Sequence, residues 1–232
     1  MIAFAAPAAA GGGLLGTPVA AGSSGLSVPM QIVILLTLLT LLPAVIMSIT
    51  PFLRIVVVLH FLRQALGTQM TPSNQVLVGL ALFLTMLIMQ PVAAQVYKDA
   101  WQPLEQGSIT TAEALERGAK PLRDFMLRFA REKDIQLFVE ITHAEAPRSP
   151  ADLEMRILIP AYVISELRTA FQIGAVLFLP FLIIDLVVAS VTLSIGMIQL
   201  PPVMVSAPFK ILLFVLVDGW NLVVGSLVRG FY

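Results

Sequence analysis

Three ionisable side chains lie within stretches of this sequence that are otherwise apolar. Asp185 lies within Phe171–Ile195, and Lys210 and Asp218 lie within Val203–Val228. An ionisable side chain at bilayer depth costs about 2.5–3.5 kcal/mol even on the lenient insertion scale, so such residues usually face a partner helix, an aqueous cavity or a transport pathway. The residues that join the two stretches carry no charge. The pattern predicts a helical hairpin that assembles with partners around an uncharged turn.

The spacing of these charges argues against an ion pair within one helix. Lys210 and Asp218 are eight residues apart, which corresponds to about 12 Å of helical rise and roughly 80° of rotation beyond two turns. Counted from a tight turn at Gly196–Pro202, Asp185 lies further away than Lys210, which predicts different depths for the two charges. We therefore predict that Asp185 pairs with Lys210 of a neighbouring subunit. A static salt bridge is favoured over a proton relay, because a nearby lysine keeps a carboxylate ionised. Arg54 and Asp218 are also predicted to form charge pairs between subunits.

The composition indicates a membrane protein. Of 232 residues, 58% are hydrophobic and 12% are charged, whereas soluble domains carry about 25% charged residues. The 14 basic and 14 acidic residues balance, so net charge predicts no nucleic-acid partner. The absence of cysteine excludes disulfides and cysteine zinc sites. His60 and His143 lie far apart and no catalytic motif stands out, so we expect no enzyme, no metal and no cofactor.

Charge is concentrated in the middle of the chain and divides it into four segments. Residues 98–168 carry ten of the 14 basic and twelve of the 14 acidic residues. We interpret residues 1–29 as a flexible tail or a degenerate signal peptide, 30–97 as a first apolar helical hairpin, 98–168 as a polar helical insert, and 169–232 as a second apolar hairpin. The sequence thus predicts an all-α membrane protein with two long helical hairpins.

Apolar runs of spanning length predict the membrane helices. Met30–Ile49 contains no charged residue and would be about 30 Å long as a helix, enough to cross a bilayer. The other predicted spans are Gln75–Tyr97, Phe171–Ile195 and Val203–Val228. Arg54 and Arg63 flank the tip of the first hairpin, which by the positive-inside rule predicts a cytoplasmic tip and a periplasmic insert.

The insert contains signals for several short helices. Thr110 and Glu113 fit a capping box at the start of one helix. Gly118 predicts the end of that helix and Pro121 the start of the next. Asp134 is predicted to cap a third helix. Because amphipathic helices commonly build cores, we interpret these helices as a small packed core rather than a groove for a partner.

Several long motifs resemble one family of membrane proteins. Residues 160–174, PAYVISELRTAFQIG, are similar to the signature of the FliP family of flagellar export-gate proteins. Residues 63–67 (RQALG), residues 74–85 (NQVLVGLALFLT) and the C-terminal hairpin, from Gly196 through Lys210 to Trp220, also match that family. The resemblance covers about Val28 to Tyr232.

The resemblance implies a subunit of the export gate of flagellar and related type III secretion systems, and a flagellar system is favoured. Family members reside in the bacterial inner membrane, in the flagellar basal body. They assemble as a pentamer with the FliQ and FliR proteins into a helical, cone-like complex next to the FlhA and FlhB export proteins. Unfolded flagellar subunits pass through its centre. For this chain, the resemblance therefore implies a helical homo-oligomer that forms part of an export channel.

The resemblance also implies a gating role for the uncharged turn. The family carries three consecutive methionines after a glycine, whereas this chain has Met197, Ile198 and Gln199, with Met204 beyond two prolines. Methionine is flexible and polarizable, which suits a seal around chains of varied shape. We predict that these four residues form the gating constriction, with an amide introduced at Gln199.

Two other classes of function remain open from the residues alone. A small-solute or ion transporter is one, but transporters typically contain internal repeats around a midplane site, and no repeat relates the two apolar halves of this chain. A structural scaffold without a conduit is the other. Cross-linking of an exported substrate to position 197 would distinguish an export channel from a scaffold.

Overall fold

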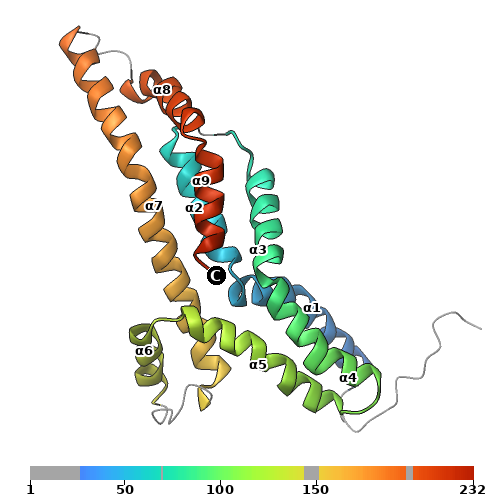
Figure 1. The fold of residues 1–232 in the computed structure, drawn as a ribbon. Helices are drawn as coiled ribbons and strands as arrows, with labels where there is room; N and C mark the ends of the chain where they lie inside the picture. Colours follow the sequence, from blue (N-terminus) through green and yellow to red (C-terminus); the bar gives the residue numbers. More distant parts are fainter. Residues whose placement is uncertain (1–26, 69, 144–151, 197–200) are drawn as a thin grey trace, which may run out of the picture. The chain divides into compact units, whose positions relative to one another are not determined.

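The computed structural model describes residues 27–68, 70–143, 152–196 and 201–232, and these ranges contain helices and no β-strand. The helices are α1 (Val28–Ile49), α2 (Phe52–Ala65), α3 (Asn74–Val96), the π-helical η1 (Tyr97–Trp101), α4 (Gln102–Glu105), α5 (Thr111–Phe129), α6 (Glu132–Thr142), α7 (Met155–Ser194), α8 (Pro202–Leu216) and α9 (Gly219–Arg229) (Figure 1). The chain divides into two compact units, Met1–Leu42 and Pro43–Tyr232. The predicted all-α class is confirmed, whereas the predicted tail lies, up to residue 26, outside the described residues.

Three of the described helical stretches are long and apolar enough to cross a membrane: Val28–Ile49, Asn74–Glu105 and Met155–Ser194. The bent pair α8 and α9 adds a fourth if it counts as one span. α7 has 40 residues, or about 60 Å of helix. The boundaries that charge predicted, at 97–98 and 168–169, fall within continuous helical stretches. They therefore mark a change in polarity along helices rather than helix ends.

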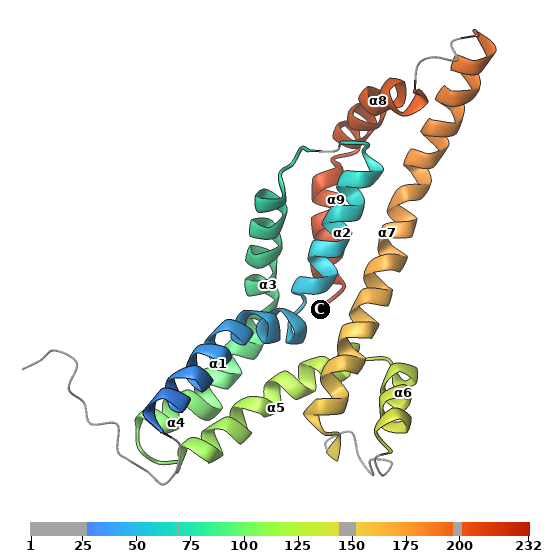
Figure 2. The same cartoon turned by 180° about the vertical axis from the view of Figure 1, so that it is seen from behind.

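α2 lies between α3 and α7 at the centre of the Pro43–Tyr232 unit (Figures 1 and 2). Its residues Ile55, Val58, Leu59 and Leu62 follow the i, i+3, i+4, i+7 spacing of one helical face, and all four are fully buried. Burial of apolar side chains between helices contributes favourably to the free energy of folding. This face therefore fixes the position of α2 against α7.

α7 packs tightly against α2 at Gly174. A Cβ atom there would lie 2.5 Å from Cδ2 of Phe61. The Phe61 ring also makes edge-to-face contacts with Phe171 and Phe178 of α7, at centroid distances of 5.1 and 6.1 Å. Glycine suits this position because a Cβ atom would overlap the Phe61 ring and force it to shift.

The insert contains α5 and α6, which pack against α7. Oγ1 of Thr110 accepts a hydrogen bond from the backbone N–H of Glu113 at 3.3 Å, which confirms the predicted N-cap. The predicted break at Gly118 and Pro121 is wrong, because α5 runs through both residues. A Cβ atom at Gly118 would lie 3.3 Å from Cβ of Ala100. This glycine therefore permits close packing of α5 against η1 and does not end the helix.

The last apolar run is not a single helix. α8 and α9 are bent by 64° relative to each other. Asp218, between them, adopts a left-handed backbone conformation with φ of 51°. A Cβ atom at Gly219 would lie 2.2 Å from Cδ2 of Phe214. The predicted span Val203–Val228 is therefore wrong as one continuous helix, because the chain turns sharply around the Phe214 ring.

Candidate functional site: two ion pairs on the longest helix

A buried ion pair joins α2 to α7. Nε of Arg54 donates to Oε2 of Glu166 at 2.7 Å, and Nη2 donates to Oε1 at 2.5 Å. The Glu166 side chain is 0% exposed and that of Arg54 is 7% exposed. Two parallel N–H···O bonds fix the guanidinium and the carboxylate in a defined relative geometry. The pair therefore sets the rotation of α7 relative to α2.

Aromatic rings from α5 and from the residues after α9 enclose this pair. The guanidinium carbon of Arg54 lies 4.0 Å from the ring centroid of Phe231 and 5.4 Å from that of Phe129. The centroids of Phe231 and Phe129 are 5.0 Å apart, and that of Phe125 is 6.4 Å from Phe231. A desolvated cation is attracted to ring faces at such distances. The arrangement links the insert and the end of the chain to the α2–α7 contact.

Ser165, next to Glu166, connects α7 to the start of α6. Its Oγ donates to Oδ2 of Asp134 at 2.6 Å and accepts from the backbone N–H of Arg131 at 2.9 Å. The prediction that Asp134 caps this helix is wrong, because the N-cap is Arg131 and Asp134 lies within the first turn. Negative charge is favourable in a first turn, and here the carboxylate is buried against α7.

A second ion pair joins α7 to α8. Nζ of Lys210 donates to Oδ2 of Asp185 at 2.6 Å, and Oγ of Ser206 donates to Oδ1 at 2.5 Å. Lys210 and Ser206 are buried one turn apart on α8, whereas the Asp185 side chain is 30% exposed. The ammonium lies close to Gly67, just beyond the C-terminal end of α2, where positive charge is favoured. One carboxylate thus connects the last quarter of α7 to α8.

In the single chain that the structure describes, Asp185 pairs with Lys210 of the same chain, and the predicted pairing between subunits stays a prediction. Asp185 lies nine residues before the end of α7 at Ser194, and Lys210 lies eight residues after the start of α8 at Pro202. The sequence estimate counted from a turn at Gly196–Pro202, whereas α7 already ends at Ser194, so the two charges lie at nearly equal distances from the helix ends. Arg54 likewise pairs within the chain. Additional contacts of these residues with a second subunit stay a prediction.

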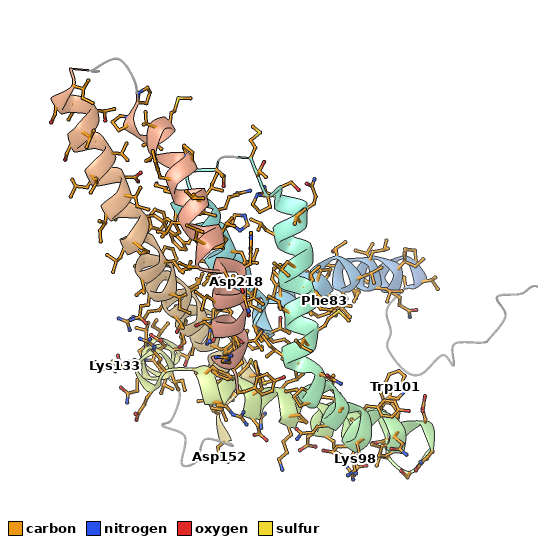
Figure 3. The ribbon with its side chains drawn as sticks, turned by 45° about the horizontal axis from the view of Figure 1, so that its top comes forward. Phe83, Lys98, Trp101, Lys133, Asp152 and Asp218 are labelled. Carbon is orange, nitrogen blue, oxygen red and sulfur yellow. The ribbon has the colours of Figure 1, made fainter. Side chains whose placement is uncertain are left out.

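Asp218 lies at the start of α9 (Figure 3). Its Oδ2 accepts a hydrogen bond from Nδ2 of Asn221 at 3.1 Å. The helical rise and rotation calculated between Lys210 and Asp218 do not apply, because the helix expected to carry both is broken between them. A contact of Asp218 between subunits remains a prediction.

The predicted gating constriction lies mostly outside the described residues. Met197, Ile198 and Gln199 fall in the range 197–200, which the structure does not describe. Met204 lies in the first turn of α8 and is 73% exposed. It precedes Ser206 by two residues, so it lies at the end of α8 that the Ser206–Asp185 hydrogen bond holds against α7.

Sequence reasoning missed Glu166, Ser206 and Phe231 as residues of this site. The charge count placed Glu166 in the polar insert, although Tyr162 and Ala170 lie four residues away on either side and would share its helical face. Both are fully buried, so this spacing could have identified Glu166 as a buried carboxylate. Ser206 could have been found by its position one turn before Lys210. No local signal pointed to Phe231.

The chemistry of the site is charge pairing. Each carboxylate accepts hydrogen bonds from a cation on another helix. Within the ranges that the structure describes, no group of three or more His, Cys, Asp or Glu side chains could hold a metal ion. The arrangement can fix α2, α7 and α8 against one another, and it holds the two helices that flank the predicted constriction.

Comparison with known proteins covers nearly the whole chain. The model of the FliP family matches residues 35–227. The flagellar biosynthetic protein FliP of Pectobacterium carotovorum subsp. carotovorum is 50% identical over 220 residues, which is 95% of this chain and 85% of that protein. The protein of the same name from Bacillus subtilis (strain 168) is 50% identical over 202 residues, 87% of this chain and 91% of its own length. That from Cereibacter sphaeroides is 46% identical over 211 residues, 91% and 70% of the two chains.

Proposed function

Because the chain belongs to the FliP family, we propose that it is a subunit of the gate through which a flagellar type III export apparatus passes unfolded proteins across the bacterial inner membrane. The observation that carries this proposal is the similarity to flagellar biosynthetic proteins FliP, which reaches 50% identity along 95% of the chain. The similarity includes both helices that flank the predicted constriction.

The geometry of the hairpin supports a gating role for the segment between α7 and α8. A constriction that opens around a passing chain needs a fixed base and residues that can adapt at its tip. The Asp185–Lys210 pair supplies the base, since it joins the two helices at matching heights. Met204 is exposed at the start of α8, and methionine side chains adapt to irregular surfaces. We assign the constriction to Met197, Ile198, Gln199 and Met204.

The exposed apolar surface of the hairpin supports assembly with other subunits. Between α7 and α8 lies a groove of about 540 Å³, lined by Ile183, Ile184, Val187, Val188, Val191, Thr192, Val205 and Phe209. Contiguous apolar surface of this kind is covered by lipid or by another protein. The proposed assembly is a homopentamer with FliQ and FliR proteins, next to FlhA and FlhB proteins.

The proposed location is the inner membrane at the flagellar basal body. The apolar hairpins 30–97 and 169–232 would enter the membrane first, and the insert 98–168 would lie in the periplasm. We propose that the chain is not an enzyme, since its function follows from assembly and gating. A small-solute or ion transporter is not favoured, because the similar proteins are flagellar biosynthetic proteins.

The proposal is tested in a bacterium that lacks its own FliP protein and carries a complementing copy of this chain. Export of flagellar subunits to the medium is measured, together with the mass of the detergent-extracted complex. The natural chain lacks cysteine, so a single cysteine can be placed at Met204, with Leu212 of α8 as a matched exposed control. We expect Met204→Cys to cross-link a stalled export substrate and Leu212→Cys not to do so. An assembled, export-competent complex in which neither position cross-links would contradict the gating role.

A further inference from the structure

The outer face of α9 is polar, which is unusual in this apolar part of the chain. Asp218, Asn221, Ser226 and Arg229 are exposed on α9 and at its start. They line a groove of about 530 Å³ together with Val217, Leu222, Gly225 and Gly230. No other exposed face of α8 or α9 in the described part of the chain carries two charged residues.

α8 shows the opposite arrangement on the other side of the bend. It buries its polar residues Ser206 and Lys210 and exposes large apolar ones. The exposed set on this helix is Val203, Met204, Phe209, Ile211, Leu212, Leu213, Val215 and Leu216. α9 instead buries Val223 and Leu227, and its exposed large apolar residues are Trp220 and Leu222. A helix in contact with hydrocarbon exposes apolar side chains, and charged ones there are costly. α8 therefore fits a lipid or apolar environment, whereas the outer face of α9 fits water.

The charges on α9 do not require a fixed ion partner. Asp218 lies at the N-terminal end of the helix and Arg229 in its last turn, which is the favourable orientation for both with respect to the helix dipole. Asp218 also accepts a hydrogen bond from Asn221 of the same helix. One acidic and one basic residue give the groove no net charge. An amide and a hydroxyl add hydrogen-bond donors and acceptors that can serve many sequences.

These features fit an extended polypeptide of varied sequence better than a permanent subunit contact. A static interface in an apolar assembly pairs its charges with fixed partners, whereas the two charges of this groove sum to zero and Asp218 is hydrogen-bonded within its own helix. Gly225 leaves room at its centre, because only Oδ1 of Asn221 lies within 4 Å of a Cβ built there, at 3.9 Å. Resting on the proposed export function, we infer that the outer face of α9 lines the water-filled path and contacts the unfolded polypeptide in transit.

The test uses single-cysteine variants in the complete export complex in lipid nanodiscs, where both membrane sides are accessible. Asn221→Cys and Ser226→Cys report on the groove, Leu212→Cys on the exposed apolar face of α8, and Val223→Cys on the buried face of α9. The probe is a membrane-impermeant sulfonated maleimide. We expect the two groove positions to react at least about tenfold faster than the other two, because a thiol in apolar surroundings ionises less readily.

Contact with the polypeptide is tested by photo-cross-linking from the same cysteines to an export substrate stalled in the complex. We expect Ser226→Cys to cross-link the substrate. Three results would each overturn the inference. They are slow labelling of both groove positions, cross-links only to a neighbouring subunit, and fast labelling without any substrate cross-link. Export of flagellar subunits by each variant is measured in parallel. A variant that exports normally while its groove remains unlabelled refutes the inference about α9 and leaves the proposed function intact.

Discussion

Glu166 and Asp185 are the two acidic residues of α7, and each pairs with a cation from a different helix. Glu166 is fully buried and receives both bonds of a guanidinium fork. Asp185 is 30% exposed and shares its oxygens between an ammonium and a hydroxyl. A buried charge that loses its partner is left without solvation, whereas a partly exposed one can be hydrated. The comparison indicates that the α2–α7 contact is the more rigid of the two, while the α7–α8 contact tolerates the loss of one charge at lower free-energy cost.

Removing the carboxylate charge at the buried pair gives the largest expected effect. Glu166→Gln leaves the Arg54 guanidinium buried without its counter-ion, so we expect a loss of about 3–5 kcal/mol in stability. The measurement is the midpoint of thermal unfolding of the purified complex, together with the yield of assembled complex. Glu154→Gln is the matched control, because its pair with Arg156 is exposed and exposed pairs contribute about 0–1 kcal/mol.

A double replacement distinguishes an unpaired buried charge from lost packing as the cause of this effect. Arg54→Met combined with Glu166→Leu removes both charges and keeps apolar volume, which is often neutral for buried pairs. We expect the double variant to be more stable than Glu166→Gln alone. If the double variant were the less stable of the two, the loss would stem from packing rather than from an unpaired charge.

Removing the cation of the second pair is expected to have a smaller effect. Lys210→Met leaves Asp185 partly exposed and still hydrogen-bonded to Ser206, so we expect a loss of about 2 kcal/mol, between the values for exposed and buried pairs. The same unfolding measurement checks it. A loss equal to or larger than that of Glu166→Gln would contradict the expected difference in rigidity between the two contacts.

The rigid contact also depends on the close approach of α2 and α7 at Gly174. Gly174→Ala places a methyl group against the Phe61 ring. Overpacking costs about 1–3 kcal/mol, and the roughly 1 kcal/mol gain in helix propensity from alanine offsets part of it. We expect a net loss of about 1 kcal/mol. Adding Phe61→Leu to Gly174→Ala should recover part of this loss, because it removes the ring that the methyl group meets. As a control, adding Phe61→Leu to Gly118→Ala should recover nothing, because a Cβ atom at Gly118 meets Ala100 instead. The unfolding midpoint measures both.

An effect of similar size is expected at the ring that covers the buried pair. Phe231→Leu keeps an apolar side chain but removes the ring face from the Arg54 guanidinium, 4.0 Å away. We expect a loss of about 1 kcal/mol. Tyr232→Leu is the control, because Tyr232 is exposed. Equal effects of the two substitutions on the unfolding midpoint would show that the cation–ring contact contributes nothing.

The helices could be predicted from the sequence because long apolar runs have few alternatives to helix in a membrane protein. The ends of the helices were harder. Gly118 and Pro121 are typical terminators, but packing of α5 against η1 overrides them. The break between α8 and α9 had a signal that was not used, since the pair Asp218-Gly219 is a common turn dipeptide.

The partners of the charges could be predicted only in part. Asp185 and Lys210 were identified as a pair from their residue types and positions, but the choice between chains depended on where the helices end. Arg54 was identified without its partner, because Glu166 lies 112 residues away in sequence. Pairings at such separations follow from tertiary packing and leave little trace in local pattern.

The Asp185–Lys210 pair forms within the chain and holds the two helices that flank the predicted constriction. The most direct test compares Asp185→Lys and Lys210→Asp, each alone, with both in one chain and with the two single variants co-expressed as separately tagged chains. Assembly of the complex and export of flagellar subunits are measured. We expect the double variant in one chain to assemble and export better than either single variant, and the co-expressed single variants not to complement each other. Recovery by the co-expressed single variants to the level of the double variant would contradict this expectation.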